Sequence, residues 1–366
     1  MIPEFNLFFD ILDVNSWENI EIKRGSEKGY QRPLMMKLAL MIQFFDACER
    51  VGGWYRSPLA DAIAERWFDS VDVRVVRASS NFVTTFTHKD TKYYLRFNHE
   101  TERSLSHINA EVGFINHLIE RSIPANKPVP SIVGNLVESV DSERGIFHAV
   151  LFEAVPGVHL ESNELDLDGF KRWGAALGRF HNASEGLEID DAPSWRDQVA
   201  TFRAEVPRNP VLDREITKIE KTLLKTRVSG KNFGLIHYDF EMDNIKWVDG
   251  VPGLMDFDDF CYHWYATDIV NALADIHDGK MNGLEKEDSR FTAFIDGYRS
   301  IRWIGSEELK HIPRFIRLDK LYTYARVHRS IEGGPLSDEP EWASKLREKL
   351  ESHNLSVLED IIQNPI

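Results

Sequence analysis

The chain has 366 residues, which is long enough for two domains with sizeable cores, and its apolar fraction of 42% is ordinary for a globular protein. The net charge of −15 argues against nucleic acid as a partner and weakly favours a cationic substrate, although many acidic proteins have no such substrate. Two cysteines, Cys48 and Cys261, make no disulfide framework or zinc site, so a cytoplasmic location is the simplest. We expect no signal peptide and no membrane partner, because the most apolar stretch, 34–45, is too short to cross a bilayer.

Residues 1–57 are predicted to form a helical N-terminal extension. Apolar residues recur there at helical spacing: Leu34, Leu38, Met41, Ile42 and Phe45. Gly52 and Gly53 are expected to stop this helix. Simple packing against the next domain is the favoured interpretation, and a homodimer through this extension is the alternative.

Residues 58–153 change to a strand pattern after a short predicted helix at 60–67. Three strands are expected at 71–76, 83–87 and 93–97, with a turn at 89–92. From residue 154 onwards helical patterns dominate. A helix at 174–181 carries His181, which we expect to be a packed or capping residue rather than a catalyst.

The most informative segment runs from His237 to Asn244 with the spacing H-x-D-x-x-x-x-N, and a second acidic run starts at Asp256. Kinase-type phosphoryl transfer needs one carboxylate for the attacking hydroxyl, and an amide oxygen and a second carboxylate to hold magnesium on the triphosphate. The residues between the two runs are typical of a hairpin that turns at Asp249-Gly250. Each motif alone is common in solvated turns, but both in this order indicate a kinase.

These motifs resemble those of the aminoglycoside phosphotransferase and choline kinase group of small-molecule kinases, over roughly residues 58 to 330. The resemblance implies that Asp239 is the catalytic base and that Asn244 and Asp256 bind Mg²⁺. It also implies that His237 supports the catalytic loop and that Asp268, at the start of a helix, braces it.

The pattern departs from that of eukaryotic protein kinases at two positions. Tyr238 stands where they have arginine, and Asp258 stands where they have glycine, which favours the small-molecule branch. The implied architecture is an α+β fold with two lobes. The extension at 1–57 precedes a β-rich, nucleotide-binding small lobe at 58–153 and a mainly helical lobe at 154–366 that holds the catalytic and acceptor sites.

The small lobe is expected to bind the nucleotide. Ser79, Ser80 and Asn81 lie where kinases keep a glycine-rich loop, so their backbone N–H groups are candidates for phosphate binding, although such residues suit any β-turn. Arg96 replaces the usual strand lysine, and Glu111 on the next predicted helix is its expected partner. The alternative is a surface arginine and a solvated glutamate.

Backbone groups from Glu153 to Val155 are expected to contact the adenine edge, where the lobes join. ATP, or GTP, and Mg²⁺ are therefore the expected cofactors. Arg96 leaves the choice between the two nucleotides open, because its planar fork differs from an ammonium group.

The expected reaction is transfer of the γ-phosphate to a hydroxyl of a small, amine-containing molecule. A protein Ser/Thr kinase of the same fold and a nucleotide-binding pseudoenzyme are the alternatives, and the intact Asp239, Asn244 and Asp256 argue against the latter. Candidate acceptor residues, each equally suited to a core, are Tyr262, Trp264, Tyr265, Asp296, Tyr298, Tyr322 and Arg326. Asp258 stays open between substrate or metal contact and capping, whereas Asp259 is expected to cap a helix or support the loop.

Overall fold

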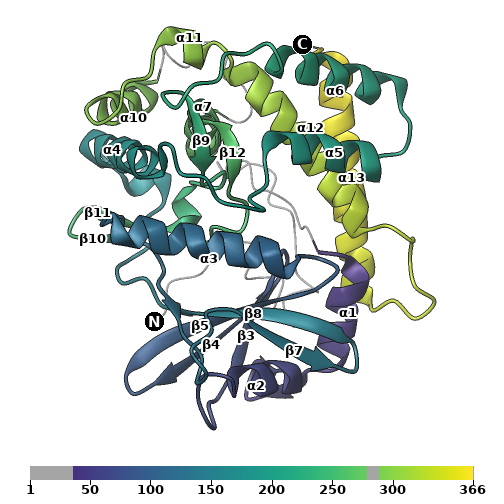
Figure 1. Cartoon of the computed structure of the whole chain (residues 1–366). Helices are drawn as coiled ribbons and strands as arrows, with labels where there is room; N and C mark the ends of the chain where they lie inside the picture. Colours follow the sequence, from purple (N-terminus) through teal and green to yellow (C-terminus); the bar gives the residue numbers. More distant parts are fainter. Residues whose placement is uncertain (1–35, 278–287, 366) are drawn as a thin grey trace.

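The computed structural model describes residues 36–277 and 288–365. They form a small lobe built on a β-sheet and a larger, mainly helical lobe, as Figure 1 shows, and this confirms the predicted α+β, two-lobed fold. None of the described helices combines the length and apolar character needed to cross a membrane. Leu34 and the rest of the first 35 residues of the predicted extension lie outside the described ranges.

The small lobe is built on one antiparallel sheet with the order β3-β4-β5-β8-β6, and β7 also pairs with β8. The strands are β3 (Arg74–Ala78), β4 (Phe82–His88), β5 (Thr91–His99), β6 (Pro128–Val129), β7 (Glu138–Ser142) and β8 (Gly145–Glu153). The three predicted strands correspond to β3, β4 and β5. The first was predicted three residues too early, because residues 71–73 precede the paired part of β3.

Helices cover both faces of this sheet. On the side toward the large lobe lies α3 (Leu105–Glu120), as Figure 1 shows. The other face packs against α1 (Leu38–Asp46) and α2 (Pro58–Ala64), which share one apolar core with β3, β4 and β5.

The N-terminal helix ends earlier than predicted. It stops at Asp46, and Gly52 and Gly53, with φ of +57° and +90°, form the turn of a hairpin between β1 (Glu49–Val51) and β2 (Trp54–Arg56). The prediction that these glycines stop the helix is therefore wrong, since two residues with positive φ are what a two-residue hairpin turn requires. The predicted helix at 60–67 is α2, which ends at Ala64.

The large lobe contains most of the helices. They are α4 (Leu167–Ser184), α5 (Trp195–Glu205), α6 (Pro210–Leu223), α7 (Tyr265–Ala272), α8 (Ala274–His277), α10 (Ser289–Arg299), α11 (Ser306–Leu309), α12 (Ile312–Ser330) and α13 (Glu341–Gln363), with short 3₁₀ turns η2 (Ser162–Glu164) and η3 (Met242–Asn244). Two short antiparallel pairs carry the motif segments: β9 (Phe233–Ile236) with β12 (Cys261–Trp264), and β10 (Ile245–Val248) with β11 (Val251–Leu254). The predicted hairpin is therefore present as β10 and β11.

The last helix, α13, brings the C-terminal part of the chain against the N-terminal helix α1. In Figure 1, α13 runs from the large lobe down to α1, and the Trp342 and Phe45 rings lie 5.6 Å apart. Leu346 and Leu350 of α13 belong to the apolar core of the small lobe. The described part of the extension thus packs within its own chain, and a homodimer through it stays a prediction.

Candidate active site

The loop after β9 is held by one buried carboxylate. Asp268 at the start of α7 accepts hydrogen bonds from the backbone N–H of His237 (2.9 Å) and of Tyr238 (2.7 Å). Tyr238 has a φ of +68°, an uncommon conformation, and its carbonyl accepts a bond of 2.6 Å from the Asn271 amide. These are the contacts that the predicted brace requires.

His237 links this loop to the second acidic run. Its Nδ1 accepts a bond of 3.3 Å from the Asp239 backbone N–H, so its Nε2 carries the proton and donates to the Met255 carbonyl at 3.1 Å. Burial lowers the pKa of His237, which favours the neutral ring, and the two hydrogen bonds set the tautomer. Its contacts are those of a supporting residue, as predicted, and not those of a proton-transfer group.

Asn244 orients the predicted base. Its amide nitrogen donates to Asp239 Oδ2 at 2.8 Å and to the Asp239 carbonyl at 3.0 Å. The amide oxygen is then the atom of Asn244 suited to a metal ion. The Met255 N–H donates to the Asn244 carbonyl at 3.0 Å, so the residue before Asp256 is fixed beside Asn244.

Asp256 lies between two guanidinium groups. Its Oδ2 accepts a bond of 2.8 Å from Arg77, and its Oδ1 lies 3.6 Å from Arg96. Burial and the neighbouring Asp258 raise the pKa of Asp256, against the opposing effect of both arginines. A carboxylate and an amide oxygen at this point are hard donors of the kind that Mg²⁺ prefers, so the donor set fits the expected metal.

Arg96 also makes the predicted ion pair, because its other nitrogen donates to Glu111 Oε2 on α3 at 2.5 Å. Both side chains are buried. Arg96 pairs across the sheet with Val83 on one side and Val150 on the other, so it lies on the sheet face that α3 covers. The contact is confirmed, and the role of the pair in nucleotide binding stays a prediction.

The turn between β3 and β4 is tied to the acidic run. Asn81 is fully buried and donates to Asp258 Oδ2 at 2.7 Å, while its own oxygen accepts a 2.7 Å bond from Asn98. The backbone N–H of Ser79 donates to the Asn81 carbonyl at 3.2 Å within this turn, and the role of Ser79 in phosphate binding stays a prediction. Ser80 and the Asn81 backbone stay candidates.

Asp258 and Asp259 are engaged by arginines. Arg103 donates to Asp258 Oδ2 at 3.0 Å, and Arg326 makes a two-bond contact with Asp259 at 3.0 and 3.1 Å. Burial alone raises the pKa of Asp258, but Arg103 and other nearby guanidinium groups outweigh it and hold that pKa well below its ordinary value. Asp259 does not cap α7, whose N-cap is Trp264, so that half of the expectation is wrong, and the other half, support of the loop, stays a prediction.

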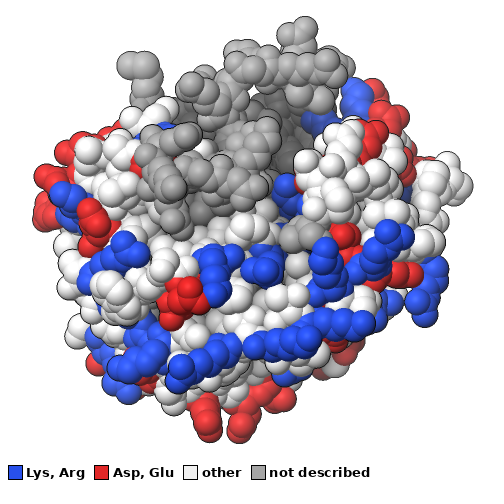
Figure 2. All heavy atoms as spheres, turned by 90° about the horizontal axis from the view of Figure 1, so that it is seen from above, with Lys and Arg blue, Asp and Glu red and all other residues white. Residues whose placement is uncertain are grey.

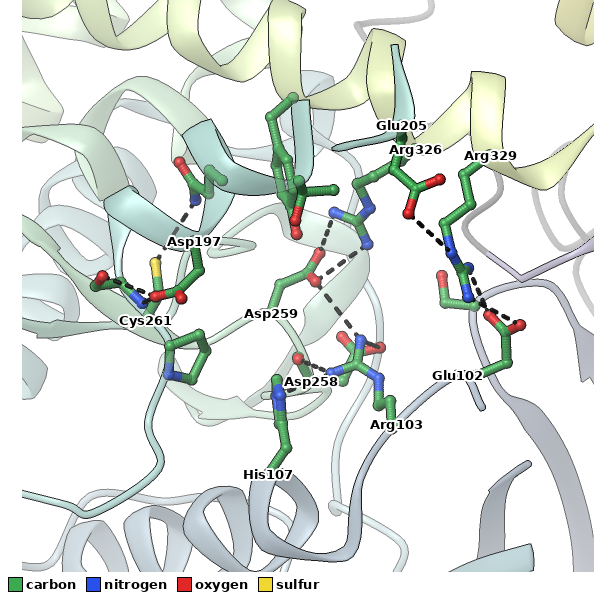
Figure 3. A pocket seen from close by; sticks show the side chains of 16 residues that line it. Glu102, Arg103, His107, Asp197, Glu205, Asp258, Asp259, Cys261, Arg326 and Arg329 are labelled. Atoms are coloured by element: carbon green, nitrogen blue, oxygen red, sulfur yellow. Dashed lines mark hydrogen bonds and ion pairs between the residues drawn. The ribbon is translucent and has the colours of Figure 1, made fainter. Parts of the chain in front are cut away.

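A cavity of about 320 Å³ opens beside these two carboxylates, as Figure 3 shows. One wall is a single face of α5, with Asp197, Thr201 and Glu205 at i, i+4 and i+8. Its other lining residues are Ser80, Glu102, Arg103, His107, Pro193, Ser194, Gln198, Asp258, Asp259, Cys261, Tyr322, Arg326 and Arg329. Tyr322 and Cys261 pack against Tyr238, so the cavity adjoins the catalytic loop.

The structure separates the candidate acceptor residues. Tyr322 and Arg326 line this cavity, whereas Tyr262 and Trp264 line a second cavity of about 360 Å³. Tyr265 and Tyr298 are core residues, as the buried 2.9 Å bond between the Tyr298 hydroxyl and His181 shows, and Asp296 is exposed on α10. Three arginines of the site, Arg77, Arg103 and Arg329, were not predicted from the sequence.

The adenine contacts stay predictions. Glu153 ends β8, and its N–H donates to the Lys127 carbonyl at 3.0 Å. Its carbonyl oxygen is therefore the candidate adenine contact, together with the N–H of Val155.

Known proteins that are similar to this chain are phosphotransferases and kinases. The model of the phosphotransferase enzyme family matches residues 72–304, which is more than half of the chain. The amicoumacin kinase of Bacillus subtilis is 25% identical over 295 residues, covering 77% of this chain and 87% of that protein. The homoserine kinase of Rhizobium etli is 27% identical over 212 residues, 55% of this chain and 63% of that protein.

Solved structures show the same fold. An amicoumacin kinase in complex with AMP-PNP and Ca²⁺ superposes with a TM-score of 0.67 at 24% identity, covering 80% of this chain and 92% of that one. A microcompartment-associated aminopropanol kinase gives a TM-score of 0.60 at 20% identity, with 83% and 97% covered.

Proposed function

Because this chain belongs to the phosphotransferase enzyme family, we propose that it transfers the γ-phosphoryl group of ATP, bound with Mg²⁺, to a hydroxyl of a small, amine-containing molecule. Family membership makes it a kinase with an alcohol group as acceptor, and ATP with a divalent metal ion is typical of the family. The observation that carries the proposal is the arrangement of Asp239, Asn244 and Asp256 around one hydrogen-bonded loop pair.

The chain's own residues position the reactants. Asp239, held by Asn244 and by the His237 ring, orients the acceptor hydroxyl and accepts its proton late in the reaction. Asn244 and Asp256 would hold the metal ion, which neutralises charge on the phosphates when bound. Arg96, fixed by Glu111, binds phosphate oxygens from the sheet side. Positioning and charge neutralisation supply most of the catalysis in such a site.

The cavity beside Asp258 supports a small acceptor. Its volume of about 320 Å³ lies at the lower end for ligand pockets, and its walls come from both lobes. Homoserine and aminopropanol, for which two of the similar kinases are named, are molecules of this size class.

Charge in the same cavity supports an amine. Five carboxylates line it against three guanidinium groups, and burial together with Arg103 lowers the pKa of His107 to about 4, so that imidazole is neutral. The sign of the charge varies over the surface of the protein. Figure 2 shows a band of Lys and Arg along one edge of the face in view, despite the net charge of −15. Local charge in the cavity is therefore a better guide to the acceptor than net charge.

The direct test is a coupled assay of ATP consumption by purified protein with panels of amino alcohols, hydroxy amino acids and aminoglycosides. We expect acceptor-dependent turnover with at least one amine and with no matched neutral alcohol. Glu205→Gln should raise KM for that amine, because Glu205 lines the cavity, while Glu348→Gln at an exposed position of α13 serves as the matched control. Acceptor-dependent turnover confined to neutral alcohols would contradict the amine assignment.

A further inference from the structure

A second arginine reaches the metal-binding carboxylate, and the sequence gives no sign of it. Arg77 on β3 donates to Asp256 Oδ2 at 2.8 Å, although the two residues are 179 positions apart. With Arg96 on the other oxygen, Asp256 has a guanidinium group on each side.

A β-bulge aims Arg77 at the cleft. Val75 pairs with Thr84, but the next pair is Arg77 with Val83, so β3 contains one extra residue at this point. Without the extra residue, Arg77 would pair with Phe82 on the buried core face. Bulges of this kind are frequent beside active sites, where they turn a side chain to the other face of a sheet.

The bulge puts Arg77 in one row with Arg96. Arg77 pairs with Val83, and Val83 pairs with Arg96, so the three side chains share one face of three adjacent strands. The two arginines are therefore about 10 Å apart at the backbone and converge on Asp256 from either side of Val83. Arg77 also lies two residues before Ser79, at the entry to the candidate phosphate turn.

The pairing with Asp256 conflicts with metal binding at the same oxygen. Mg²⁺ binds a carboxylate oxygen at about 2.1 Å, so the ion and a guanidinium nitrogen on one oxygen lie within about 5 Å of each other and repel. The triphosphate that accompanies the ion offers pairs of oxygens that the planar guanidinium fork can bind at two points.

On the basis of the proposed function, we propose that Arg77 is a phosphate-binding residue of the nucleotide site, which exchanges Asp256 for phosphate oxygens when Mg·ATP binds. In the free protein its guanidinium balances the charge of Asp256. In the complex it adds a second fixed positive charge to that of Arg96. The turn at residues 79–81 contains no glycine, and its Ser79 N–H bonds to the Asn81 carbonyl within the turn. Arg77 thus adds a side-chain donor for the phosphates.

The test is titration calorimetry with two probes, AMP-PNP with Mg²⁺ and adenosine, on Arg77→Ala, Arg77→Gln and Arg77→Lys. Both uncharged variants should bind AMP-PNP about ten-fold or more weakly, the lower end for a lost charge-assisted bond, and should bind adenosine as the wild type does. Arg77→Lys should retain part of the affinity for AMP-PNP. Arg74→Ala is the matched control, because Arg74 lies on the same strand but pairs with exposed Asp72.

Unchanged AMP-PNP affinity in both uncharged variants would overturn the inference, and so would an equal loss of adenosine and AMP-PNP, which would mean a structural role. Either result leaves phosphoryl transfer by the wild type intact and so leaves the proposed function standing. Failure of the wild type itself to bind AMP-PNP with Mg²⁺ would instead contradict the proposed function.

Discussion

Two regions of the candidate active site are held in place differently. One is the catalytic loop of the large lobe, and the other is the phosphate face of the small lobe, which carries Arg77, Arg96 and the turn at residues 79–81. The loop from His237 to Asn244 is held from within the large lobe, where Asp268 accepts hydrogen bonds from two successive N–H groups. The phosphate face, in contrast, depends on strand register and on ion pairs between the lobes, such as that of Arg77 with Asp256.

The difference shows which part of the site is fixed before a nucleotide binds. The loop is supported from the large lobe through the Asp268 carboxylate, a neutral buried histidine and the bond from the Met255 N–H to the Asn244 carbonyl, and none of these supports crosses the cleft. On the phosphate face, guanidinium groups face carboxylates across the cleft, and a bound nucleotide changes those charges. Substitutions on the loop are therefore expected to affect chemistry, and those on the phosphate face to affect nucleotide affinity.

The largest effect is expected at Asp256, where the two regions meet. Asp256→Asn removes the charge that Mg²⁺ requires, so Mg²⁺-dependent ATP affinity and transfer should both be lost, and Asn244→Ala should show a weaker loss. Asp249→Asn is the matched control, because both aspartates have positive φ, +61° and +50°, which asparagine tolerates. ATP affinity that still rises with Mg²⁺ in Asp256→Asn would remove Asp256 from the metal site.

Replacing Asp239 is expected to lower the rate of phosphoryl transfer without changing nucleotide affinity. Asp239→Asn should lower kcat by at least about 10²-fold, because the acceptor hydroxyl loses its base, while the affinity for ATP stays near that of the wild type. Steady-state kinetics and calorimetry measure the two separately. Asp243→Asn, an exposed residue of the same loop, should keep wild-type kcat. Full activity in Asp239→Asn would exclude it as the base.

The difference between the loop and the phosphate face also explains which parts of the site could be predicted from the sequence. The spacing within 237–244 and the hairpin at β10 and β11 depend on local geometry, so their residues were placed together correctly. The pair of Arg96 with Glu111 followed from the order of strand and helix. The bulge that aims Arg77 is one extra residue in a short strand, and no residue type marks it. The cavity arginines lie on separate elements whose packing is a tertiary property, so spacing gave no signal for Arg103 or Arg329.

An intermediate effect is expected at Arg96. Arg96→Lys should retain transfer with a changed KM for ATP, whereas Arg96→Ala should weaken ATP binding about ten-fold. Removing the guanidinium also leaves Glu111 buried and unpaired, which costs about 3 to 5 kcal/mol of stability, so ATP affinity is best measured in Arg96→Ala combined with Glu111→Gln. Wild-type ATP affinity in that double variant would place Arg96 in a structural role and leave Arg77 as the main phosphate ligand.

The smallest effect concerns stability alone, at His263 on β12 behind the catalytic loop. Its Nδ1 accepts bonds from the Trp264 N–H (2.9 Å) and the Thr267 hydroxyl (2.6 Å), and burial lowers its pKa to about 3. In the unfolded chain a histidine has a pKa of about 6.5, so between these two pKa values the unfolded state binds one more proton and stability must fall as pH falls.

The slope that His263 contributes should be about 1 kcal/mol per pH unit between pH 5 and 6. Urea unfolding at several pH values measures it as the difference between the wild type and His263→Asn, whose side-chain oxygen can still accept the Trp264 N–H. The variant should be less stable at pH 7 yet lose less stability on acidification. Parallel curves for the two proteins would mean that His263 titrates over the same pH range in the folded and the unfolded chain, which would contradict a neutral, buried imidazole behind the loop.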